Sequence, residues 1–386
     1  MQQTLMNKNT PILEIEMDGN TIIKVGKVLD NTMMPMQFQN GFTTESLNQW
    51  LSGRRIPEKR EGLKEARMMF PNFEHDERFF ALSDQYWVKK NSRDTWAKYN
   101  FFTNRYSEEV GKIFFEPWNV DRKKLTEPSP DRTTNGVLRK RWEQDDNGQS
   151  YLLKAGSVMY HQEPLSEVLA SIMLKKLGII PFVQYELVIN GLRFCSKCPN
   201  FVTASTEFVP AAAIFGREPR LKTESIYDHL LKMCNKFKIV GAKDYIDKMI
   251  IADRVICNTD RHLGNFGFLR SADNGQFLGF APLFDCGSAY WGTTDTVVRR
   301  ESRLFADKER EIFAKAAKRG LLKNAKSTRE MIKLIKAYPD IRKEKRDAIL
   351  QTIDDIDMEI DKMEGSFVSE RDMDKDMAGH DMIIEF

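Results

Sequence analysis

The sequence has few cysteines and no long apolar run, and both absences restrict the class of protein it can encode. The chain of 386 residues contains five cysteines, an odd and sparse number that fits reduced thiols in a cytoplasm better than a disulfide framework. It contains no stretch of about 18 or more apolar residues, and its beginning lacks the apolar region of a signal peptide. We therefore expect a cytoplasmic protein without a membrane span.

The sequence also lacks a complete zinc site and a strong charge excess. Cys195 and Cys198 form a lone CxxC, whereas a structural zinc ion needs four ligands, so we interpret this pair as part of a turn between strands. The formal net charge is only +3, which does not by itself indicate nucleic-acid binding. With 41% hydrophobic and 11% aromatic residues, the chain can bury a sizeable core.

Four zones follow one another along the chain. Residues 1–115 mix short strands and helices and form an N-terminal α/β region. Residues 116–215 are rich in short β-branched and aromatic runs, and residues 216–364 show mostly helical periodicity. Residues 365–386 form a polar tail that we expect to be disordered. The order predicts an α+β fold with a strand-rich lobe and a mostly helical lobe behind an extra N-terminal region.

The stretch CNTDRHLGNFGFLR, residues 257–270, places polar side chains in a short loop between apolar segments. Asp260 and Asn265 stand at opposite ends of this loop, so both can direct an oxygen toward one point. Phosphoryl transfer uses such a pair, because a carboxylate orients the attacking hydroxyl while an amide oxygen helps to hold Mg²⁺. Asp285 ends the later strand-like run LFDCGS, where it could bind the same metal ion.

A lysine and a glutamate upstream fit the same chemistry. Lys154 ends the run YLLK, and Glu167 lies in the helical pattern PLSEVLASIMLKK. A lysine that points inward from a strand is costly to bury unless it is paired, and Glu167 would supply the partner. Glu163 is the competing carboxylate, but it precedes Pro164 and we expect it to lie outside the helix.

A turn rich in small polar residues precedes the lysine strand. This turn is SPDRTTNGVL, residues 129–138. Thr133, Thr134 and Gly136 could offer hydroxyls and backbone N–H groups to phosphates. The turn is not a GxGxxG motif, and taken alone it is more typical of a hairpin.

The stretch STEFVPA, residues 205–211, lies where a connector between two lobes is expected. An extended backbone here could bind adenine through the Glu207 carbonyl and the Val209 N–H group. Pro210 would stiffen the exit from this connector.

His262 is the remaining titratable side chain of the polar loop. Histidine titrates near neutral pH and could act as a general base. In a loop of the kinase kind the aspartate takes that part, so we expect His262 to be a structural loop residue that hydrogen-bonds backbone.

These features follow one another in the order found in kinases, and the detail resembles one family. The stretch NTDRHLGNFGFLR, followed by APLFDCGSAYW, resembles the HipA-like serine/threonine kinases, whose pattern is Asn-x-Asp-x-His-x-x-Asn. The helix SEVLASIMLKKLGI is also similar to that family. The resemblance covers residues from about 129 to 291.

The resemblance implies a bilobal protein-kinase-like fold, ATP and Mg²⁺ as cofactors, and phosphate transfer to Ser or Thr of a protein substrate. By position, it implies that Asp260 is the catalytic base, that Asn265 and Asp285 bind metal, and that Lys154 contacts phosphates. The N-terminal region does not resemble that of the family's toxin, but a variant region found among HipA-like proteins. A DNA-binding antitoxin or regulator is therefore an open partner.

Three functions remain open on this basis. The favoured one is an ATP-dependent serine/threonine kinase, with hydroxyls for autophosphorylation at Ser129, Thr133 and Thr134. The alternative is a kinase-like, non-enzymatic module that binds protein or DNA, which the basic stretch 299–326 would suit. A third is a small-molecule phosphotransferase of the aminoglycoside-kinase type, but there the histidine usually precedes the aspartate, whereas here it follows at position 262.

Overall fold

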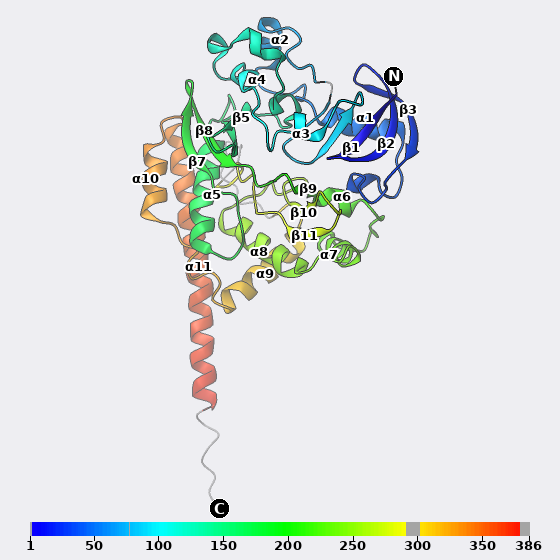
Figure 1. Cartoon of the computed structure of the whole chain (residues 1–386). Helices are drawn as coiled ribbons and strands as arrows, with labels where there is room; N and C mark the ends of the chain where they lie inside the picture. Colours follow the sequence, from blue (N-terminus) through cyan, green and yellow to red (C-terminus); the bar gives the residue numbers. More distant parts are fainter. Residues whose placement is uncertain (1, 77, 291–301, 379–386) are drawn as a thin grey trace, which may run out of the picture.

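The computed structural model describes residues 2–76, 78–290 and 302–378, of which 366–378 are described by backbone alone (Figure 1). Within these residues, antiparallel sheets and helices are mixed, as the sequence predicts. None of the described helices is both long and apolar enough to cross a bilayer.

The N-terminal part is built on a sheet in the order β3-β2-β1-β4. Its strands are β1 (Gln2–Asn7), β2 (Thr10–Asp18), β3 (Thr21–Val28) and β4 (Tyr86–Lys89). Along β2, Leu13, Ile15 and Met17 are buried while the glutamates between them are only partly buried, which is the alternation of a strand with one covered face. Helix α1 (Thr44–Gly53) is fastened to β3, because the Asn48 side chain bonds both the N–H and the carbonyl of Ile22 at 2.8 Å.

Short helical segments lie between β3 and β4 of this sheet and between β4 and β5 of the next. The α-helical ones are α2 (Leu63–Met69), α3 (Trp96–Tyr99) and α4 (Glu109–Lys112), and the 3-10 ones are η1 (Met36–Phe38), η2 (Pro117–Asn119), η3 (Arg122–Thr126) and η4 (Pro130–Thr133). Much of this part is held by aromatic side chains; for example, Phe80 stacks on Trp87 with ring centroids 5.1 Å apart.

The second sheet has the order β5-β6-β8-β7 and carries helix α5. Its strands are β5 (Lys140–Gln144), β6 (Ser150–Ala155), β7 (Glu186–Asn190) and β8 (Arg193–Pro199). Helix α5 spans Glu163–Leu177 and stops at Gly178, whose φ of 66° is the left-handed conformation that glycine favours. The expectation that Glu163 lies outside the helix is wrong by one residue, because Pro164 is tolerated in a first helical turn.

The CxxC pair also differs from the expected turn. Cys195 and Cys198 both lie within β8. Side chains three positions apart on a strand point to opposite faces, and the two cysteines belong to different apolar clusters. Both are buried and neither forms a disulfide.

The third sheet has the order β11-β10-β9. Its strands are β9 (Thr206–Pro210), β10 (Gly267–Ser271) and β11 (Phe277–Phe280). The helices are α6 (Ala211–Phe215), α7 (Ile226–Lys236), α8 (Ala242–Val255), α9 (Ala306–Lys318), α10 (Arg329–Ala337) and α11 (Lys343–Ala378). One large apolar cluster unites α5, α7, α8, α9 and the first half of α11.

Helix α11 changes the expectation for the C-terminal tail. It continues without a break through residues 365–378, where the sequence indicates disorder, and Figure 1 shows it extending away from the rest of the molecule. No proline occurs between residues 365 and 378, so helix propagation meets no covalent block there. Residues 379–386 of the expected tail lie outside the described part of the chain.

Candidate active site

Lys154 is the centre of the candidate site. It lies on β6 with its side chain only 10% exposed. Its Nζ is 2.8 Å from Glu167 Oε1 of α5 and 2.8 Å from Asp285 Oδ1. A buried ammonium needs such partners, because without them the free-energy cost of its desolvation is not offset. The structure thus brings together three residues that the sequence places in one site.

The charges of this triad are strongly coupled. Burial opposes the Lys154 ammonium, but the attraction of Asp285 and then Glu167 exceeds it, so the pKa of Lys154 lies well above its usual value. The Lys154 charge in turn holds the pKa of Asp285 well below its usual range. Burial raises the pKa of Glu167. At neutral pH, Asp285 is therefore an anion beside a fixed cation.

Ser196 completes the support of this triad. It lies on β8 next to β6, and its hydroxyl donates to Glu167 Oε2. With Oε1 engaged by Lys154, both carboxylate oxygens of Glu167 are satisfied inside the protein. Sequence reasoning missed Ser196, although it lies between the two cysteines of the CxxC pair.

Arg261 holds the polar loop, and sequence reasoning missed it too. Its guanidinium is 1% exposed and makes two bonds of 2.9 Å to the Asp253 carboxylate of α8. It also donates to the backbone carbonyls of Asn265 at 2.9 Å and Phe284 at 2.6 Å. One side chain thus ties the end of α8, the polar loop and the segment before Asp285. The only sequence signal was an arginine directly after Asp260.

Asp260 lies at the open side of this loop. Its side chain is 46% exposed, and its Oδ1 is 3.1 Å from Nη1 of Arg303, which is itself 70% exposed. Because its side chain is this exposed, the Asp260 carboxylate is accessible. An ion pair between two exposed side chains contributes little stability. Asn265 is partly buried, and its backbone N–H donates to the His262 carbonyl at 2.9 Å.

His262 is exposed and contacts backbone. Its Nδ1 accepts a hydrogen bond of 3.1 Å from the Gly264 N–H. This contact stays within the loop, as expected for a residue that shapes the turn.

Asp285 adopts a strained backbone conformation. Its φ is 58°, in the left-handed region that non-glycine residues seldom occupy. The Asp285 N–H donates to the Tyr185 hydroxyl at 3.2 Å, and Lys154 Nζ lies 5.5 Å from the centre of the Tyr185 ring. A bridge between Phe182 and Leu283 aligns the two segments. Tyr185 therefore supports both the strained residue and its partner lysine.

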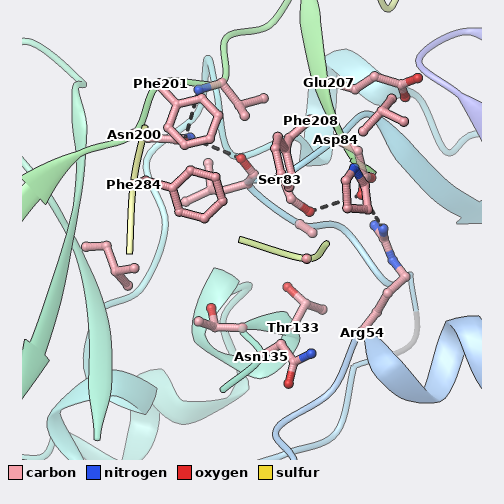
Figure 2. Close-up of a pocket in the computed structure, with 18 of the residues that line it drawn as sticks. Arg54, Ser83, Asp84, Thr133, Asn135, Asn200, Phe201, Glu207, Phe208 and Phe284 are labelled. Atoms are coloured by element: carbon pink, nitrogen blue, oxygen red, sulfur yellow. Dashed lines mark hydrogen bonds and ion pairs between the residues drawn. The ribbon is translucent and has the colours of Figure 1, made fainter. Parts of the chain in front are cut away.

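A cavity of about 770 Å³ opens beside this triad, a size that suits a small organic ligand. Lys154 and Asp285 line it, and Gly264 is the part of the polar loop that reaches it. Asp260 and Asn265 are not among its lining residues. Figure 2 shows the part of the cavity where the rings of Phe201, Phe208 and Phe284 gather.

The expected phosphate turn lies on the cavity wall, but its hydroxyls are engaged. Thr133 and Thr134 line the cavity. The Thr133 hydroxyl donates to the Phe80 carbonyl at 2.6 Å, and the Thr134 hydroxyl to the Pro130 carbonyl at 2.7 Å. Both hydroxyls therefore stabilise the η4 turn, and a ligand would meet them only through their remaining lone pairs.

Gly136 and Lys140 adjoin this turn. Gly136 has a φ of 103°, a backbone conformation that strains residues other than glycine. Lys140 lines the cavity and lies opposite Lys154 in the sheet register. Burial, and then repulsion by Lys154, lowers the pKa of Lys140 to about 7. Sequence reasoning missed this second lysine.

The connector residues differ from the expectation. In the antiparallel register, Glu207 faces Arg270 and Val209 faces Phe268, while the N–H of Phe208 between them bonds outward. Backbone groups alternate in direction along a strand, so those of Glu207 and Val209 point toward β10. The expected adenine contacts through the Glu207 carbonyl and the Val209 N–H are therefore not available in this geometry.

The Glu207 side chain forms a buried ion pair with Arg270. Its Oε1 is 2.8 Å from Nη1 of Arg270, and both side chains are almost fully buried. Burial raises the pKa of Glu207 to about 7, although Arg270 opposes that shift. Arg270 further donates to the Met34 carbonyl at 3.1 Å, so this pair joins the N-terminal part to the third sheet.

Comparison with known proteins shows that part of the chain is similar to a kinase. A serine/threonine-protein kinase, CtkA of Helicobacter pylori, is 46% identical over 107 residues, which are 26% of this chain and 33% of that kinase. The chain thus matches about a third of the length of this curated relative. No protein-family model matches the chain.

The solved structure of one kinase shows a similar fold. The crystal structure of the H. pylori proinflammatory kinase CtkA aligns with a TM-score of 0.52 at 18% identity, covering 63% of this chain and 96% of CtkA. A Shewanella oneidensis complex of HipA, HipB and operator DNA aligns with a TM-score of 0.49 at 15% identity, over 95% of this chain and 94% of that one. The resemblance to serine/threonine kinases predicted from the sequence is thus confirmed over part of the chain, and CtkA has a similar fold.

Proposed function

We propose that this chain is an ATP- and Mg²⁺-dependent serine/threonine protein kinase. The observation that carries the proposal is Lys154 fixed between Glu167 and Asp285 at the wall of a ligand-sized cavity. In this arrangement the lysine can contact phosphates while the aspartate faces a metal ion. The curated relative named as a serine/threonine kinase supports the reaction class.

A magnesium ion suits the residues present. Within the described residues, no group of three or more His, Cys, Asp or Glu side chains forms a ready-made metal cage. Mg²⁺ in phosphoryl-transfer sites is instead held by one or two protein oxygens together with the nucleotide phosphates. Asp285, whose side chain is 40% exposed, and Asn265 would supply these oxygens. The bound ion would offset the negative charge of the phosphates.

The remaining residues divide the work of transfer. The ion pair between Arg303 and Asp260 Oδ1 would first break. Asp260 would then accept a hydrogen bond from the attacking Ser or Thr hydroxyl and orient it. Lys154 would hold the nucleotide phosphates, with Glu167 and Ser196 keeping its ammonium in position. The proposal includes the bilobal organisation, with β5–β8 in a strand-rich lobe and α7–α11 in a helical one.

Autophosphorylation and a protein partner remain parts of the proposal. Ser129 and Thr133 are buried, whereas Thr134 is partly exposed, so Thr134 is the acceptor that the turn offers most readily. A separate protein substrate carrying Ser or Thr is the other acceptor. A DNA-binding regulator is proposed as a partner on the family resemblance alone.

Incubation of the purified chain with radiolabelled ATP and Mg²⁺ tests the proposal. We expect label on the chain itself or on a protein of a bacterial lysate, and loss of that label in Asp260→Ala and Lys154→Met. Asn274→Ala, an exposed change in the turn between β10 and β11, is the control that retains activity. Nucleotide binding without any transfer would instead favour the non-enzymatic module.

A further inference from the structure

The outer edge of β9 is occupied by the N-terminal part of the chain. The N–H of Phe208, which faces away from β10, donates to the Ser83 carbonyl at 2.9 Å. The Gln85 side chain donates to the carbonyls of Thr203 at 2.9 Å and Thr206 at 3.1 Å. The segment around Ser83 is therefore paired with the connector, and a ligand cannot use this edge of the strand.

The same segment lines the cavity next to the aromatic rings. Phe201, Phe208 and Phe284 pack together with ring centroids 5.3–5.8 Å apart, and the residues 81–84 line the cavity with them. Figure 2 shows Ser83, Asp84 and Arg54 joined by a chain of interactions beside these rings. Because Phe284 directly precedes Asp285, this aromatic end adjoins the end that holds Lys154.

The polar groups on this wall are hydrogen-bond acceptors. The Ser83 hydroxyl donates its proton to Asp84 Oδ2 at 3.0 Å, so its oxygen keeps only acceptor capacity. Asp84 Oδ1 accepts from the Tyr86 N–H at 3.0 Å, and Arg54 fixes Asp84 Oδ2 at 2.5 Å. The Arg54 guanidinium also bonds the Phe79 carbonyl at 2.7 Å, so it is directed into the protein. Ser83 itself is exposed and faces the cavity.

We propose that the segment Ala81–Asp84 forms the base-binding end of the nucleotide cleft and selects a base that presents an amino group. A flat base fits against the aromatic rings, and its exocyclic amino group donates to the acceptors at Ser83 and Asp84. A keto oxygen at the same place meets an acceptor and leaves a polar group unpaired, which is costly. This inference rests on the proposed function and gives the N-terminal part a share in substrate selection.

Binding of ATP and ITP to the full-length chain with Mg²⁺ tests this inference by calorimetry, independently of turnover. ITP carries a keto oxygen where ATP carries the amino group. We expect ATP to bind about tenfold more tightly, as one well-placed hydrogen bond allows. In Ser83→Ala this preference should fall to about threefold or less. In Asp84→Asn the new amide donor should shift the preference further toward ITP.

The control is Ser92→Ala, because Ser92 is an exposed serine of the same N-terminal part that does not line the cavity. It should keep the wild-type ratio, and thermal unfolding shows whether each variant is folded. Equal binding of ATP and ITP by the wild type, or an unchanged ratio in folded Ser83→Ala, would overturn the inference. Failure to bind either nucleotide would overturn the proposed function itself, so the two failures are distinguishable.

Discussion

Replacement of Lys154 by methionine tests the charge arrangement on which the site depends. The substitution keeps most of the side-chain volume but removes the cation between Glu167 and Asp285. Breaking a buried ion pair typically costs about 3–5 kcal/mol. Because the Asp285 side chain is 40% exposed, solvent offsets part of this penalty, and we expect a loss of about 2–4 kcal/mol in the free energy of unfolding at pH 7.

The pH dependence of that loss is the sharper measurement. With Lys154 gone, Glu167 and Asp285 face each other as like charges, so the pKa of at least one of them rises in the folded state. A raised carboxyl pKa gives stability that is present at low pH and is lost as pH rises through the folded pKa. The deficit of Lys154→Met should therefore shrink by about 1–2 kcal/mol between pH 7 and pH 5.

Urea denaturation of wild type and variant at both pH values measures this difference. Lys197→Met is the matched control, because Lys197 lies on the adjacent strand β8 but is 30% exposed and pairs with Glu143 only at 3.4 Å. It should cost less than about 0.5 kcal/mol at either pH. A Lys154→Met deficit that stays constant from pH 7 to pH 5, or one as small as the control, would refute the reasoning.

Three further changes probe the surroundings of the triad. Tyr185→Phe removes the hydroxyl that accepts the Asp285 N–H, and we expect the Mg²⁺ concentration for half-maximal phosphate transfer to rise about tenfold. Arg303→Gln breaks an exposed ion pair with Asp260, so the free energy of unfolding should change by less than about 0.5 kcal/mol, while transfer is retained. Glu207 has a pKa of about 7 in the folded chain and of about 4.3 in the unfolded chain. Its protonated form therefore stabilises the fold at low pH, and this contribution to the free energy of unfolding is lost as pH rises through 7. Glu207→Gln should make the free energy of unfolding fall less steeply between pH 5 and pH 8.

Each of these expectations has a result that contradicts it. An unchanged Mg²⁺ requirement in Tyr185→Phe would show that the strained Asp285 needs no outside support, and Tyr151→Phe on β6, whose ring contacts Lys197, is the control. A large stability loss in Arg303→Gln would mean that the ion pair with Asp260 is structural. An unaltered stability slope in Glu207→Gln would show that Arg270 keeps Glu207 ionised throughout that pH range.

The sequence by itself determined the residues that its local patterns carry. The start of α5 was predicted to within one residue, because Pro164 acts on backbone conformation at its own position. The pairing of Lys154 with Glu167 followed from the cost of burying a lysine without a partner, and the motif around Asp260 indicated a resemblance to kinases. All of these signals lie within short windows of the chain.

Only the tertiary structure decided how distant segments complete the site. Arg261 joins α8 to the segment before Asp285, and Ser83 occupies the edge of the connector at Phe208. The direction of the Glu207 backbone groups, which removed the expected adenine contacts, depends on strand register with β10. Pairings across such long sequence separations are selected by the packing of the whole molecule, because a local pattern fixes a residue's conformation but not its distant partner.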